Sequence, residues 1–141
     1  MTDLSITIEK RIEAPIDKVF DAWLNPITLA KFMQPAPDMP DSPTTTDARV
    51  GGRFEIIMHV GENQISHRGE YLEIDRPHKL SFTWESPASL DDSVVTLSFT
   101  AVENKATNIV LTHVKFIDEE RRSNHEGGWS RILTGLNRIL Q

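Results

Sequence analysis

The five histidines of this 141-residue sequence are its best candidates for acid–base or metal chemistry: His59, His67, His78, His113 and His125. None of them forms the i, i+4 pair of a helical zinc site or an HExxH pattern. His59 and His67 come nearest to a metal pair, since they can face each other across a short hairpin loop on the strand face away from Phe54. The sequence therefore predicts no metal site and no cofactor.

His113 has a different setting, because it shares a strand face with Ile109 and Leu111 and should point toward the protein interior. A partly buried imidazole there can orient a ligand or act as a general base. A hydrogen-bonded core histidine is the favoured alternative. No catalytic residue is predicted.

Composition and motifs exclude several other kinds of function. The chain has no cysteine, so disulfides, thiolate nucleophiles and cysteine-bound zinc are absent. It contains no Gly-x-Ser-x-Gly elbow, P-loop or dinucleotide fingerprint. A net charge of −6 argues against a partner with a phosphate backbone. No apolar run approaches the roughly 20 residues that span a bilayer, and the N-terminus has no signal-peptide pattern, so we expect a cytoplasmic protein without membrane insertion.

Hydrophobic periodicity predicts the elements that must position these side chains. Residues 4–12 alternate as a half-buried strand, and apolar residues recur at helical spacing from Ile16 to Leu24. Asn25-Pro26 ends that helix and caps a second short one. A proline-rich stretch at 34–43 predicts a surface loop. Five further strands follow at 53–60, 65–74, 80–84, 95–101 and 108–116, and the parity of the second is ambiguous around Gly69.

A long helix is predicted over 118–140, with Asp118 as its N-cap. Its apolar stripe consists of Trp129, Ile132, Leu133, Leu136 and Leu140. Gly127-Gly128 inside it indicates a bend or a close approach to the backbone. Short connections imply an antiparallel meander with one apolar face, which this helix covers. That face should carry Phe54, Ile56, Phe82, Leu97 and Phe99, within a single α+β domain spanning 1–141.

Six stretches resemble a known family: RIEAPIDKVFDAWLNPITLAKFM (11–33), VGGRFEI (50–56), GEYLEIDRPHKLSFTW (69–84), VTLSFT (95–100), LTH (111–113) and GGWSRILTGL (127–136). They resemble the START-like, helix-grip superfamily (SRPBCC). More closely, they resemble the family named after the C-terminal domain of the activator of the heat-shock protein 90 ATPase. The resemblance implies a curved antiparallel sheet, here six-stranded, wrapped around a long C-terminal helix, with two short helices after the first strand and an apolar cavity.

The leading functional hypothesis is a binding protein, monomer or homodimer, for a small apolar or aromatic molecule held between the sheet and the C-terminal helix. The residues predicted to contact it are Trp23, Phe32, Phe54, Ile56, Met58, Tyr71, Phe82, Trp84, Leu97, Phe99, Leu111, His113, Trp129 and Leu133. The same side chains would also fill a closed core. Two alternatives stay open, a co-chaperone related to the heat-shock protein 90 ATPase activator and a cyclase- or hydrolase-type enzyme using the same cavity.

Overall fold

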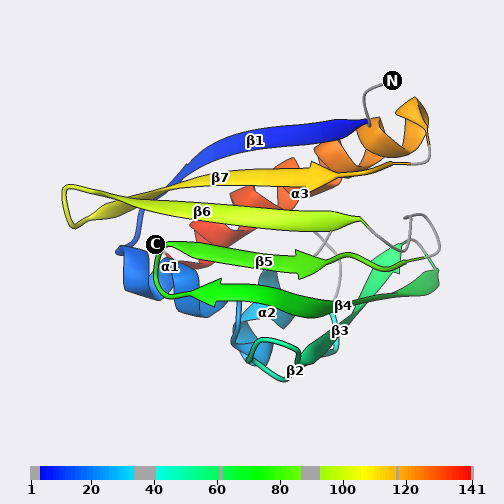
Figure 1. The fold of residues 1–141 in the computed structure, drawn as a ribbon, viewed down its shortest axis with the longest axis horizontal. Coiled ribbons are helices and arrows are strands. Elements are labelled where there is room, and N and C mark those ends of the chain that lie inside the picture. Colours follow the sequence, from blue (N-terminus) through cyan, green and yellow to red (C-terminus); the bar gives the residue numbers. More distant parts are fainter. Residues whose placement is uncertain (1–3, 34–40, 61, 87–92, 117, 141) are drawn as a thin grey trace.

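The computed structural model describes residues 4–33, 41–60, 62–86, 93–116 and 118–140. Its elements follow in the order β1 (Ser5–Ile12), α1 (Ile16–Ala22), α2 (Pro26–Phe32), β2 (Thr44–Thr46), β3 (Arg53–Val60), β4 (Asn63–Asp75), β5 (Lys79–Thr83), β6 (Val94–Val102), β7 (Ala106–Val114) and α3 (Glu119–Leu140). The predicted α+β fold, with two short helices after the first strand and a long last helix, is confirmed (Figure 1).

The strands form one antiparallel sheet in the order β1-β7-β6-β5-β4-β3-β2. The described residues thus contain seven strands, where the sequence predicts six. The additional strand is β2, an edge strand in which Thr45 pairs with Glu55. Three threonines are too few to show an alternating pattern, so periodicity could not reveal it. Most of the proline-rich stretch, residues 34–40, lies outside the described residues.

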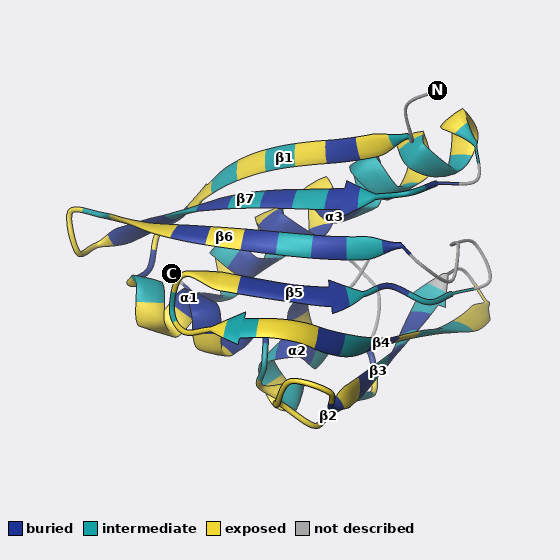
Figure 2. Ribbon diagram, in the orientation of Figure 1, coloured by how far each residue is buried: buried dark blue, intermediate teal, exposed yellow. Residues whose placement is uncertain are grey.

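Inward-facing residues run across the sheet in register. One such row joins Ile6, His113, Val95 and Phe82 on four neighbouring strands. These positions are buried, and in Figure 2 buried positions alternate with more exposed ones along β6 and β7. The five residues predicted for the inner face are all buried and belong to one hydrophobic cluster, so that prediction is confirmed.

Gly69 explains why the parity of β4 was ambiguous in the sequence. It lies opposite Phe54, and a Cβ built on it would come within 2.0 Å of the Thr83 carbonyl oxygen. Only glycine fits such a close backbone approach. A register shift follows between Tyr71 and Glu73, after which the alternation resumes. The bulge turns Tyr71 into the core, whereas Leu72 is 43% exposed.

Helix α3 crosses one face of the sheet, behind β1, β7 and β6 in Figure 1. The carboxylate of Asp118 accepts a 2.9 Å hydrogen bond from the Arg121 backbone N–H, which confirms the predicted N-cap. The predicted apolar stripe is buried throughout. The helix is continuous through Gly127-Gly128, and no described residue lies within 4 Å of a Cβ built on Gly128. The predicted close approach therefore lies at Gly69 rather than at this pair.

The short helices cover the inner face beside α3. The Asn25 side chain caps α2 by accepting hydrogen bonds from the backbone N–H groups of Ile27 and Thr28. The Ser42 hydroxyl donates to the Met33 carbonyl over 2.7 Å, and the Ser42 N–H donates to the Ala30 carbonyl. These bonds fix the C-terminal end of α2 and direct the Met33 side chain into the core, where it is fully buried.

Candidate functional site

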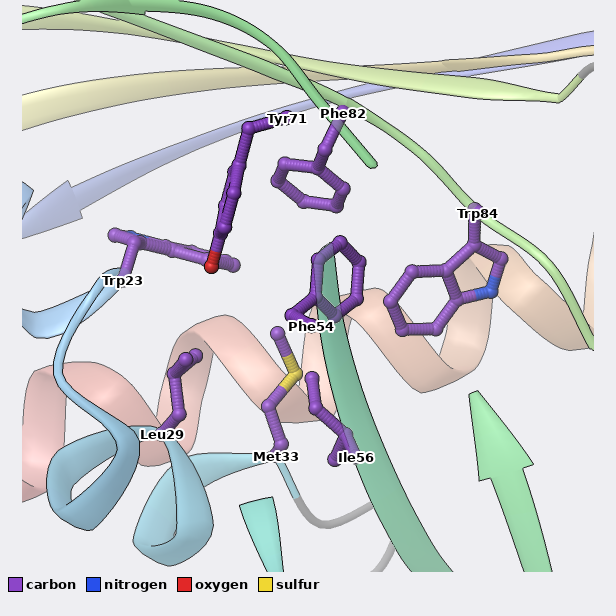
Figure 3. Close-up of a pocket in the computed structure, with 8 residues that line it drawn as sticks. All are labelled: Trp23, Leu29, Met33, Phe54, Ile56, Tyr71, Phe82 and Trp84. Carbon is purple, nitrogen blue, oxygen red and sulfur yellow. The ribbon is translucent and has the colours of Figure 1, made fainter. Parts of the chain in front are cut away.

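A small cavity lies between strands β3, β4 and β5 and the end of the α1–α2 unit (Figure 3). Eight side chains line it: Trp23, Leu29, Met33, Phe54, Ile56, Tyr71, Phe82 and Trp84. None belongs to α3, so this cavity lies beside the short helices and not against the C-terminal helix as the sequence predicts. The reason is that the α3 stripe packs directly into the core, with Leu133 and Leu136 completely buried.

The cavity is narrow. It leaves about 10 Å³ for the centre of a water-sized sphere, which is the room that about one water molecule needs. The unfilled space extends to about 230 Å³ when the part open to solvent is included. A larger molecule must therefore displace a lining side chain. Met33 is suited to this, because its unbranched thioether rotates about three bonds and adapts to irregular spaces.

Six of the predicted contact residues line this cavity: Trp23, Phe54, Ile56, Tyr71, Phe82 and Trp84. The other eight are buried elsewhere in the core: Phe32, Met58, Leu97, Phe99, Leu111, His113, Trp129 and Leu133. Sequence reasoning missed two lining residues, Leu29 and Met33. Both belong to the second short helical segment, where they stand four positions apart, so helical spacing could have suggested them.

Aromatic rings form most of the cavity wall. The Phe54 ring meets that of Phe82 edge-on at 5.2 Å between centroids and lies 5.4 Å from the Tyr71 ring. Trp23 packs edge-on against Phe32 at 5.0 Å, and this contact anchors Trp23 from behind. Such edge-to-face contacts hold the rings in defined orientations. The wall is therefore rigid on the sheet side and adaptable at Met33.

Three lining side chains carry polar atoms, and all are hydrogen-bond donors without protein partners. The buried indole nitrogens of Trp23 and Trp84 have no partner. The Tyr71 side chain is 2% exposed, and its hydroxyl bonds to no residue that the structure describes. Burial raises the pKa of the Tyr71 phenol, with a smaller effect from Asp47, so the hydroxyl stays protonated at neutral pH. In Figure 3 this hydroxyl points inward toward Trp23.

His113 is a hydrogen-bonded core histidine. Its Nδ1 accepts a 3.0 Å bond from the Trp129 indole N–H, and its Nε2 lies 3.3 Å from the Ser93 hydroxyl. An indole N–H can only donate, so the imidazole proton lies on Nε2 and is donated to Ser93. The Ser93 hydroxyl in turn donates to the Trp84 carbonyl over 2.6 Å. These hydrogen bonds occupy both imidazole nitrogens, so neither is free to contact a ligand or transfer a proton.

The electrostatic setting of His113 also opposes catalysis. Burial, with a smaller contribution from nearby His125, lowers the pKa of His113 to about 3. The imidazole is therefore neutral at physiological pH and far from the value that suits a general base. Its ring supports the cavity indirectly, because it holds Trp129, which packs against the cavity residue Trp84 at 4.9 Å.

His59 and His67 do not face each other, although the sequence allows it. His67 lies opposite Ile56, on the inner face, and its ring is 5.1 Å from that of Trp84. His59 instead lies opposite Gln64, so alternation places it on the other face. Burial lowers the pKa of His67 to about 4. Within the described part of the chain, no three His, Asp or Glu side chains gather as metal ligands would.

This arrangement defines the class of the protein. An antiparallel sheet that carries two short helices after its first strand and a long C-terminal helix across its inner face is the helix-grip fold of START-like proteins. The chain belongs to the family of Activator of Hsp90 ATPase homolog 1-like proteins, whose model matches residues 13–141. The resemblance found in the sequence is thereby confirmed.

Solved structures show the same fold over nearly the whole chain. An HSP90 activator from Plasmodium falciparum is 25% identical, with a TM-score of 0.78 over 97% of this chain and 96% of its own. The AHSA1-like protein from Aeromonas hydrophila is also 25% identical, with a TM-score of 0.79 over 96% and 90%. A Chromobacterium violaceum protein is 21% identical, with a TM-score of 0.78 over 96% of both chains.

The comparison with curated proteins gave no match. Among the residues that the structure describes, no helix combines the length and the apolar character needed to cross a membrane.

Proposed function

We propose that this protein binds a small apolar or aromatic molecule in the cavity between β3–β5 and the short helices. The observation that carries the proposal is the cavity itself, an unfilled space surrounded by eight buried side chains with no charged residue among them. Ligand sites in proteins are typically concave and lined by apolar and aromatic side chains with a few polar groups. The unpartnered indole N–H groups of Trp23 and Trp84 also support a polar contact at this place, because buried donors in a closed core are nearly always hydrogen-bonded.

The energetics set the expected affinity. Burying about 200 Å² of apolar ligand surface at about 25 cal/mol per Å² would provide about 5 kcal/mol before the cost of association. Widening the cavity reduces this favourable free energy, because the displaced side chains lose packing contacts. We therefore expect micromolar binding at best for a generic aromatic probe.

A fluorescence titration tests the proposal, since Trp23 and Trp84 line the cavity and should report occupancy. Naphthalene-sized and fatty-acid probes should change the emission of the wild-type protein in a saturable manner. In Met33→Ala, the ligand gains the space of the lost side chain, so we expect an affinity about tenfold higher for the naphthalene-sized probe.

Leu111→Ala is the matched control. Leu111 is as buried as Met33 but does not line the cavity, so its loss adds no space to the cavity. The affinity of the Leu111→Ala variant for the probe should equal that of the wild-type protein. No response from any probe, or the same gain in both variants, would contradict the proposed site.

A second candidate function is regulation of a chaperone of the heat-shock protein 90 type. It is supported by the family name and by the HSP90 activator from Plasmodium falciparum, which aligns with 97% of this chain. Adding the purified protein to such a chaperone should then raise its rate of ATP hydrolysis. An unchanged rate, together with no heat of binding in calorimetry, would remove this candidate.

A further inference from the structure

The cavity lining offers three hydrogen-bond donors, the Tyr71 hydroxyl, which can also accept, and the indole N–H groups of Trp23 and Trp84. The Tyr71 hydroxyl points into the space from β4, and its side chain is almost completely buried. It hydrogen-bonds to none of the described residues. The hydroxyl is not among the completely buried atoms that lack a partner, so it keeps contact with the open space beside it. The hydroxyl is therefore open to hydrogen bonding with a molecule that enters the cavity.

The two tryptophans of the lining carry further donors. The indole N–H of Trp23 is a second buried donor without a partner, and that of Trp84 is a third. In Figure 3 the Trp84 nitrogen lies on the side of its ring away from Phe54, so we assign it no contact with the ligand. No buried side-chain acceptor in the described residues lacks a partner. An acceptor atom on the ligand can therefore pair with the Tyr71 hydroxyl, which donates one hydrogen bond.

The lack of charged residues in the lining further restricts the chemical class of the ligand. The lining contains no Lys, Arg, Asp or Glu, so a charged ligand group would be buried without a counter-ion. That arrangement is strongly unfavourable in an apolar site. Burial keeps the Tyr71 hydroxyl protonated, and it therefore acts as a donor at neutral pH.

We propose that the ligand is an uncharged molecule of one or two fused rings whose carbonyl or ether oxygen accepts a hydrogen bond from the Tyr71 hydroxyl. This inference rests on the proposed function and adds the ligand's chemical class and orientation. The oxygen lies at the Tyr71 and Trp23 side of the cavity. The ring system lies against Phe54, Phe82 and Met33.

Two matched probes test the inference, 1-indanone and indane, which share a fused ring system and differ by a carbonyl in place of a methylene group. The affinity of each is measured by NMR titration for the wild type and for Tyr71→Phe. The quantity of interest is the ratio of the two affinities, because the unequal hydration of the probes cancels when this ratio is compared between proteins. In Tyr71→Phe, we expect the affinity for 1-indanone relative to that for indane to fall by about three- to tenfold. This is the size of change expected from the loss of one hydrogen bond.

Tyr71→Phe removes an unpartnered hydroxyl and keeps the ring, so its melting temperature should match or exceed that of the wild type. A third probe, indane-2-carboxylate, should not bind at concentrations that saturate 1-indanone. If both neutral probes bind and the ratio is unchanged in Tyr71→Phe, or if the carboxylate binds equally well, the inference is overturned while the proposed function stands. If neither neutral probe binds the wild type, the proposed function fails as well.

Discussion

Leu133→Ala should lower the free energy of unfolding by about 2–5 kcal/mol, the range for truncating a large buried aliphatic side chain. Leu133 lies in the middle of the α3 stripe and is completely buried. It does not line the cavity, so its side chain has close neighbours on all sides. We therefore expect the upper half of that range in denaturant melts.

Arg138→Ala provides the control on the same helix, since Arg138 is exposed. Its effect should stay within about 0.5 kcal/mol, the scale of ordinary surface substitutions. A change of that small size in Leu133→Ala would show that the helix does not pack through this stripe.

His113→Ala should lower the free energy of unfolding at pH 7 by about 3 kcal/mol or more. The substitution leaves the Trp129 indole N–H buried without its acceptor, which costs about 1–3 kcal/mol, and the loss of ring packing adds to this. The same substitution should also change how stability depends on pH, because the His113 imidazole is held neutral in the folded protein.

The sign of the pH effect follows from the lowered pKa. His113 has a pKa of about 3 when folded and about 6.5 when unfolded. Its contribution to stability is thus fully present above pH 6.5 and is lost as the pH falls toward 3. Between pH 6 and 4, this residue alone should make stability fall by about 1.4 kcal/mol per pH unit. His113→Ala should lack that part of the slope, whereas His67 still contributes.

Ile109→Ala is the matched control for this experiment. Ile109 lies on the same strand and face as His113 and is equally buried, but it carries no titratable group. The variant should be destabilised and yet keep the wild-type pH slope. If His113→Ala also keeps the full slope in urea melts between pH 6 and 4, the assignment of a neutral buried imidazole is wrong.

The sequence predicted the elements whose pattern repeats several times. The α3 stripe and the alternation in β6 and β7 each extend over two or more periods, so the burial of Leu133, Leu97 and Leu111 followed directly. It did not predict β2, which has three residues, or the parity of β4, where Gly69 and a bulge interrupt the alternation. The sequence also did not show that His67 faces the core. The face on which this residue lies depends on the register between β3 and β4.

The cavity itself depends on packing that periodicity does not describe. Trp84 and Trp129 both belong to inward-facing patterns, yet only Trp84 lines the space, because Trp129 bonds to His113 and packs behind it. Leu29 and Met33 reach the cavity because α2 ends where Ser42 holds the Met33 carbonyl. That contact joins residues nine positions apart in the sequence, and no repeating pattern records it.

An isotope-filtered NOE experiment on the methyl-labelled protein with a bound naphthalene-sized probe tests the central claim most directly. If the molecule binds in the cavity, the probe protons should give NOEs to the Met33 and Ile56 methyl groups, which line it. NOEs confined to the exposed side chains of Ile27, Val50 and Leu72 would place the probe on the surface and contradict the account.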